Sequence, residues 1–207
     1  MSKITVIGNM ALLVLVLAFV SCKKEDPVSV PVITTPASTS ATSSPQFTGS
    51  IDGIVVNYLN GYVGYSSGGT LGTGTPSDFR YGGVLLNGAT LSEVLNVEKG
   101  NLNLPSGGYA TNAEFGNFFP LGNYGFDASL LNGIVLTYYS GGTEWSTSLG
   151  SGDQTGSTFT VVDRLETTVA GDFVVKYKAT FNCKIYDGSG AEKLITNGVL
   201  VSAFSNI

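Results

Sequence analysis

The chain has 207 residues, with 15 acidic against 10 basic side chains and a formal net charge of −5. This balance argues against nucleic acid as a partner, because phosphate binding needs basic patches. The sequence contains no histidine, which excludes Ser–His and Cys–His nucleophile pairs and removes the commonest metal ligand.

The N-terminal segment has the composition of a secretory signal peptide. Lys3 precedes an unbroken apolar run over residues 10–20, and the small residue Ser21 follows it. The run is about eleven residues long, whereas a helix that spans a bilayer needs about twenty. Residues 1–21 are therefore predicted to be a signal peptide. An uncleaved N-terminal anchor is the alternative.

The stretch "FVSC", residues 19–22, resembles the lipobox of bacterial lipoproteins, and "CKKED" after it is similar to the start of Bacteroidota lipoproteins. The resemblance implies cleavage before Cys22 and attachment of a diacylglycerol thioether and an N-acyl chain such as palmitate. Phe19 departs from the family's usual leucine. Lys23, where the family uses aspartate for inner-membrane retention, implies the outer membrane. Several acyl chains together would hold the protein firmly to it.

Residues 22–46 are predicted to be a lipidated N-terminus followed by a flexible tether. From Pro27 to Gln46 the chain is uncharged, rich in Ser and Thr, and contains four of the seven prolines. This composition is typical of a partly extended linker. The folded part is predicted over residues 47–207, which is long enough for one domain with a hydrophobic core.

Strand and turn signals fill this domain. The pairs Asp52–Gly53, Asn87–Gly88 and Gly141–Gly142 each separate two apolar-rich runs, which predicts three hairpins. Thr111 and Glu114 have capping-box spacing and Pro120 is a stop signal, so a short helix is predicted near residues 112–119.

The clearest strand is residues 172–187, where apolar and polar side chains alternate from Phe173 to Ile185. A turn and a last strand over about residues 193–204 complete the chain. Together these elements predict an all-β fold, an antiparallel β-sandwich with one short helix. A closed barrel is the alternative. Residues 47–207 also resemble small Bacteroidota lipoproteins of unknown function, which implies no catalytic residue.

Several motifs imitate sites of known chemistry. Ser66 in "GYSSG" matches a nucleophile elbow but has no histidine base, and "GGTLGTG", residues 68–74, reads as a loop without the ending of a phosphate-binding loop. The oxygen-rich segments around Asp153 and Asp187 read as ordinary turns rather than calcium sites. Cys183 lies on the apolar face of its strand and is predicted to be a buried, unreactive side chain.

No spacing of carboxylates marks a catalytic pair, so the chain is predicted not to be an enzyme. A carboxylate-dependent hydrolase is the weakest alternative. No metal or cofactor is predicted.

Aromatic residues are the only suggestive group. Tyr62, Tyr65 and Tyr81 flank a Gly/Ser/Thr-rich stretch predicted to be a long loop, and Trp145 is the only tryptophan. These four rings are candidates for stacking on a sugar, although a role in the core is the stronger interpretation. The sequence thus predicts a lipoprotein anchored at the outer membrane that binds or supports a partner. That partner is a glycan or an outer-membrane protein.

Overall fold

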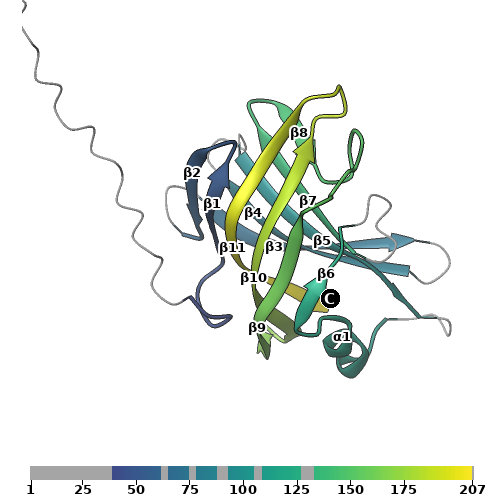
Figure 1. The fold of residues 1–207 in the computed structure, drawn as a ribbon. Coiled ribbons are helices and arrows are strands. Elements are labelled where there is room, and N and C mark those ends of the chain that lie inside the picture. Colours follow the sequence, from purple (N-terminus) through teal and green to yellow (C-terminus); the bar gives the residue numbers. More distant parts are fainter. Residues whose placement is uncertain are drawn as a thin grey trace, which may run out of the picture. The chain divides into compact units, whose positions relative to one another are not determined.

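The computed structural model describes residues 39–61, 65–74, 78–87, 93–104, 109–126 and 133–206 (Figure 1). The predicted signal peptide, Cys22, most of the tether, Tyr62 and Gly88 lie outside these ranges.

The described residues form eleven strands and one helix. The strands are β1 (Gln46–Ile51), β2 (Ile54–Leu59), β3 (Tyr65–Gly74), β4 (Asp78–Asn87), β5 (Glu93–Asn103), β6 (Gly122–Tyr124), β7 (Ile134–Ser140), β8 (Thr143–Ser146), β9 (Thr158–Val169), β10 (Asp172–Tyr186) and β11 (Glu192–Asn206). The helix, α1, is Asn112–Phe118.

All eleven strands belong to one antiparallel sheet. Its main path is β2-β1-β11-β10-β8-β7-β5-β4-β3, and β9 branches from β10 and pairs with β6. The sheet is open, because β2 and β3 end this path. The predicted all-β antiparallel class with one short helix is confirmed. The described strands nevertheless form one continuous sheet, neither two separate sheets nor a closed barrel.

The sheet coils so that distant parts of it face each other across the core. Figure 1 shows β10 and β11 crossing over β4 and β5, and β11 contacts both β3 and β4. Gly83 of β4 lies directly against Ser202 of β11: a Cβ atom built on Gly83 would be 2.3 Å from Ser202 Oγ. A single hydrophobic core fills the space inside. Its largest fully buried side chains include Phe47, Tyr81, Phe115, Phe159, Tyr177 and Phe181.

The alternation predicted for β10 is confirmed. Val175, Tyr177, Ala179, Phe181, Cys183 and Ile185 are all buried on the inner face. The outer face carries Lys176, Lys178 and Lys184, which are partly exposed, and Thr180 and Asn182, which are exposed. β10 pairs with β11 on one side and with β9 on the other, so this strand is the centre of the fold.

Two of the three predicted hairpin turns are confirmed. Ile51 pairs with Ile54 around Asp52 and Gly53, whose φ angles are 52° and 80°, as a tight turn with two left-handed residues requires. Ser140 pairs with Thr143 around the second such turn, Gly141–Gly142. The prediction of a two-residue turn at Asn87–Gly88 is wrong. β4 and β5 do pair, but Leu86 faces Val94, so the connection is longer.

The Gly/Ser/Thr-rich stretch predicted to be a loop is a strand instead. β3 pairs with β4 from Tyr65–Asn87 to Gly74–Asp78. The pairing uses main-chain hydrogen bonds, which glycine can supply as well as any residue, so low hydrophobicity did not prevent it. Ser66 therefore lies within a hairpin strand opposite Leu86. A nucleophile elbow would need a turn from a strand into a helix, and the backbone at Ser66 has none.

The predicted helix is confirmed with its capping box. The Thr111 hydroxyl accepts a hydrogen bond from the Glu114 N–H at 3.2 Å, and the Glu114 carboxylate accepts one from the Thr111 N–H at 2.8 Å. α1 also meets β9: the Arg164 guanidinium donates to the Gly116 carbonyl at 3.1 Å. The helix thus lies beside the part of β9 that extends beyond β6, where an uncovered strand edge would invite aggregation.

Candidate functional site

Of the four candidate aromatic residues, the structure describes the side chains of Tyr81 and Trp145. Tyr62 lies outside the described residues, and the backbone of Tyr65 pairs with Asn87 in β3. Tyr81 is only 2% exposed, with its ring centroid 4.7 Å from that of Phe115. Tyr81 is therefore a core residue, and its proposed role in stacking on a sugar is wrong.

Trp145 occupies a different place from Tyr81. It lies on β8, is partly buried and packs against the core. The ammonium of Lys193 lies 4.2 Å from the centroid of the Trp145 ring, so one face of the indole already has a cationic partner. A sugar that stacked on this face would have to displace Lys193.

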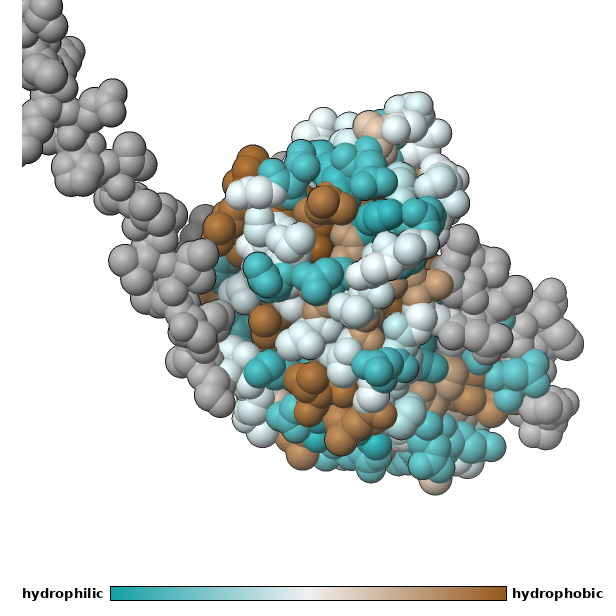
Figure 2. Space-filling model, viewed as in Figure 1, coloured by the Kyte–Doolittle hydropathy of each residue, from teal (hydrophilic) through white to brown (hydrophobic). Residues whose placement is uncertain are grey.

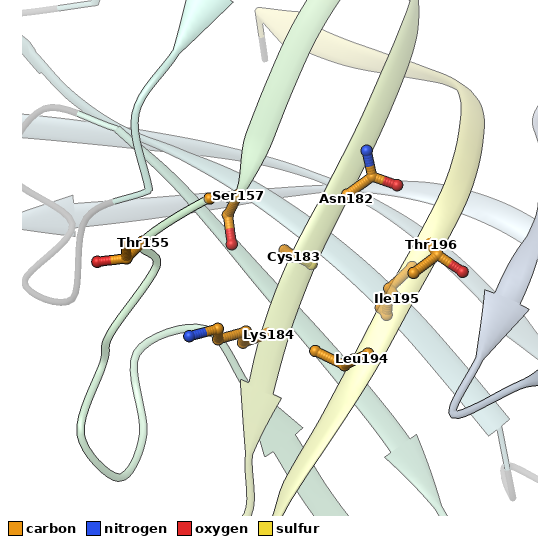
Figure 3. Close-up of a pocket in the computed structure, with 9 residues that line it drawn as sticks. Thr155, Ser157, Asn182, Cys183, Lys184, Leu194, Ile195 and Thr196 are labelled. Carbon is orange, nitrogen blue, oxygen red and sulfur yellow. The ribbon is translucent and has the colours of Figure 1, made fainter.

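A shallow surface hollow lies on the outer side of β10 and β11. Figure 3 shows Thr155 and Ser157 on the loop at one side, Asn182 and Lys184 on β10, and three residues of β11. Those three are Leu194, Ile195 and Thr196. The hollow thus combines hydroxyl and amide groups with two aliphatic side chains, of which Ile195 is buried and Leu194 is 46% exposed.

The loop that borders this hollow is held by a side chain that pairs with the backbone of β10. Gln154 Nε2 donates to the Lys184 carbonyl at 2.7 Å, and Gln154 Oε1 accepts from the Lys184 N–H at 3.2 Å. Ser157 Oγ also donates to Gln154 Oε1 at 2.8 Å. Gln154 therefore satisfies the edge of β10 just beyond its last pair with β9, Asn182–Thr158. Gln154 and Lys184 are 30 residues apart in the chain, so no local sequence signal could have revealed the hollow.

The carboxylates near the hollow stabilise turns. Asp153 accepts from the Lys184 ammonium at 2.8 Å and from the Thr155 N–H at 2.9 Å. These bonds, led by that from Lys184, hold the pKa of Asp153 well below its usual range. Asp187 accepts from the Ser189 hydroxyl at 2.6 Å and from two backbone N–H groups, and its pKa is also lowered. Both carboxylates are thus engaged as turn-stabilising acceptors, in agreement with the interpretation as ordinary turns.

Cys183 lies beneath the hollow, with a side chain that is 3% exposed. Burial raises the pKa of its thiol, so the reactive thiolate form is disfavoured. The predicted burial of Cys183 is confirmed.

Lys99 is an unusual ionisable residue that sequence reasoning missed. Its ammonium lies 3.3 Å from the centroid of the Phe118 ring and 5.4 Å from that of Tyr124. Burial lowers the pKa of Lys99 to about 8, while the aromatic rings favour the charged form. The sequence could not reveal these surroundings, because they depend on α1 and β6 packing against β5. Lys99 of β5 thus contacts both α1 and β6.

The visible surface is mixed rather than dominated by one apolar area. Figure 2 shows hydrophilic and intermediate residues around several separate apolar patches on this face. Within the described ranges, no helix has both the length and the apolar character needed to cross a membrane. The same part of the chain contains no cluster of three or more His, Cys, Asp or Glu residues arranged to hold a metal ion.

Comparisons with protein-family models, with curated proteins and with solved structures found no match.

Proposed function

We propose that this chain is a lipoprotein anchored at the outer membrane, and that its β-domain is a non-catalytic module that binds or supports a partner. The observation that carries the proposal is the position of Cys22, one residue after the apolar run and directly before "KKED". A lipid on this residue would place the apolar chains in the membrane and the charged residues in water.

The β-domain supports a binding or structural role more than a catalytic one. Asp153 and Asp187 are both engaged in hydrogen bonds that stabilise turns. A general acid or base at neutral pH needs a pKa moved toward 7, whereas the pKa values of Asp153 and Asp187 are lowered.

We also propose that the domain packs as a β-sandwich, in which two parts of the single sheet lie face to face. Support comes from the close approach of β11 to β4 at Ser202 and Gly83, which packs two parts of the single sheet face to face over one core.

Replacing Cys22 with Ser is expected to abolish lipid attachment and the processing that depends on it. The variant should leave the detergent phase in a phase-partition experiment and appear as soluble protein or as unprocessed precursor, because serine provides no thiol for the thioether. Immunoblotting of the two phases and mass spectrometry of the N-terminus measure both effects.

Cys183→Ala is the matched control, since it removes the other cysteine of the chain and leaves residue 22 intact. It should partition and be processed like the parent protein. Unchanged partitioning and processing of the Cys22→Ser variant would refute the lipoprotein assignment.

A second candidate function is capture of a neutral glycan, and the hollow is the observation that favours it. The hydroxyls of Thr155, Ser157 and Thr196 and the amide of Asn182 border it, and Leu194 offers an aliphatic surface. Sugars present alternating hydroxyl and C–H surfaces, which this combination can match by hydrogen bonding and apolar contact.

Binding of a glycan panel to the full mature chain in detergent tests this candidate. Asn182→Ala and Leu194→Ala are each expected to weaken binding at least tenfold, while Trp145→Ala should leave it unchanged. Loss of binding only in Trp145→Ala would indicate that the glycan binds at the indole of Trp145 and not in the hollow. Release of a hydrolysis product that a single carboxylate substitution abolishes would show that the module is catalytic.

A further inference from the structure

The end of the predicted tether folds back onto the sheet. Residues 39–45 contain only Ser, Thr, Ala and Pro, and such a composition offers little apolar surface to bury. Nevertheless Ala41 is 1% exposed. A short turn precedes β1, in which the Ser43 N–H donates to the Ser40 carbonyl at 3.0 Å. We refer to residues 39–44 as the strap.

Three charged side chains of β9 and β10 hold the strap by its main chain. The Lys178 ammonium donates to the Thr39 carbonyl at 2.7 Å, and the Lys176 ammonium donates to the carbonyls of Thr42 and Ser43 at 3.3 and 3.2 Å. Asp163 accepts from the Ala41 N–H at 2.9 Å.

The same contacts explain why the strap is separable from the sheet. All three charged residues hold the strap through their side chains, so the main-chain pairing of β10 with β9 and β11 does not depend on these contacts. Ala41 is the only fully buried residue of the strap, and its methyl group is a small apolar surface. Hydrogen bonds from partly exposed lysines are individually weak.

We propose that residues 39–44 form a releasable latch, which docks on the outer face of β9 and β10 and detaches without unfolding of the sheet. Pro45 stays in place, because its carbonyl accepts from the Asn60 N–H at 2.9 Å. Release would add six residues to the free chain, which is about 20 Å of reach at 3.3 Å per residue. The latch would therefore control the maximum distance between the domain and the attachment point of its N-terminal segment. This inference goes beyond the proposed function and stands whether or not Cys22 carries a lipid.

The docking site recognises main-chain groups and a small side chain. It therefore suits a short turn built from Ser, Thr and Ala. A larger side chain at position 41 would not fit the buried position of Ala41, whereas Thr42, which is exposed, leaves room for a larger residue. This difference between neighbouring positions supplies a pair of variants that test the latch without altering the lysines.

Hydrogen exchange of the full chain tests the proposal. In the parent protein, the Ala41 amide should exchange more slowly than an unstructured amide but faster than the amides of β10. In the Lys176→Gln/Lys178→Gln variant, exchange at Ala41 should accelerate at least tenfold while the β10 amides stay unchanged. Lys184→Gln is the matched control, because this lysine lies on the same face of β10 but pairs with Asp153, and it should leave Ala41 unaffected.

The two strap variants complete the test. Ala41→Leu should accelerate exchange of the neighbouring strap amides to the same degree, and Thr42→Leu should not. The proposal is overturned if the strap and β10 amides accelerate together, since the strap would then be an inseparable part of the sheet. It is equally overturned if the Ala41 amide exchanges as an unstructured amide in the parent protein, or if neither the lysine variant nor Ala41→Leu changes its rate.

Discussion

Replacing Phe181 with Ala is expected to lower the free energy of unfolding by about 3–5 kcal/mol, the usual range for a phenylalanine removed from a core. Phe181 is 2% exposed, and its ring centroid lies 5.7 Å from that of Phe47 and 5.5 Å from that of Phe159. These rings come from β10, β1 and β9, so one cavity would loosen three strands at once. Urea denaturation followed by tryptophan fluorescence and circular dichroism measures the change.

Thr180→Ala is the control for this prediction, because Thr180 is the neighbouring residue on the exposed face of the same strand. It should change stability by no more than about 0.5 kcal/mol. Phe181→Leu keeps most of the side-chain volume, so it should lower the free energy of unfolding by less than Phe181→Ala does. It can still be measured if Phe181→Ala fails to fold. A loss below about 1 kcal/mol for Phe181→Ala, at an unchanged denaturant dependence, would contradict the burial of this ring.

The sequence was sufficient where structure depends on local pattern. The alternation along β10, the turns at Asp52–Gly53 and Gly141–Gly142 and the capping box at Thr111 were all predicted, because each is determined by residues a few positions apart. β3 was missed for the opposite reason. Its Gly/Ser/Thr composition resembles that of a loop, and only its partner strand β4 makes it a strand. The continuity of the single sheet likewise depends on pairings between distant segments.

The candidate site was harder to predict than the fold. In the sequence, Tyr81 lies beside a polar stretch and so resembles an exposed aromatic residue. In the structure, Phe115 of α1 packs against its ring. The hollow depends on Gln154 reaching Lys184, and the strap depends on Lys178 reaching Thr39, a separation of 139 residues. None of these contacts can be predicted from a periodic pattern in the sequence. The environment of a glycine cannot be predicted either, since the sequence does not reveal what a glycine packs against.

Gly83→Ala is expected to lower the free energy of unfolding by about 1–3 kcal/mol, the usual effect of added volume in a packed core. The new Cβ would lie 2.3 Å from Ser202 Oγ and 2.9 Å from the Ala203 carbonyl oxygen. Both distances are shorter than van der Waals contact. Ser202 is itself buried, so β4 and β11 would have to move apart. Urea denaturation of the variant measures the loss.

Gly125→Ala is the matched control, because a Cβ atom there meets no other atom within 4 Å. It should be neutral or stabilise the fold by up to about 1 kcal/mol, since alanine reduces the freedom of the unfolded chain. In a Ser202→Ala background, which removes the nearest atom, Gly83→Ala should destabilise less than in the parent chain. The remaining contact with the Ala203 carbonyl should keep the rescue partial. Equal losses in the two backgrounds would show that β4 and β11 do not meet at these residues, and that the two parts of the sheet pack differently across the core.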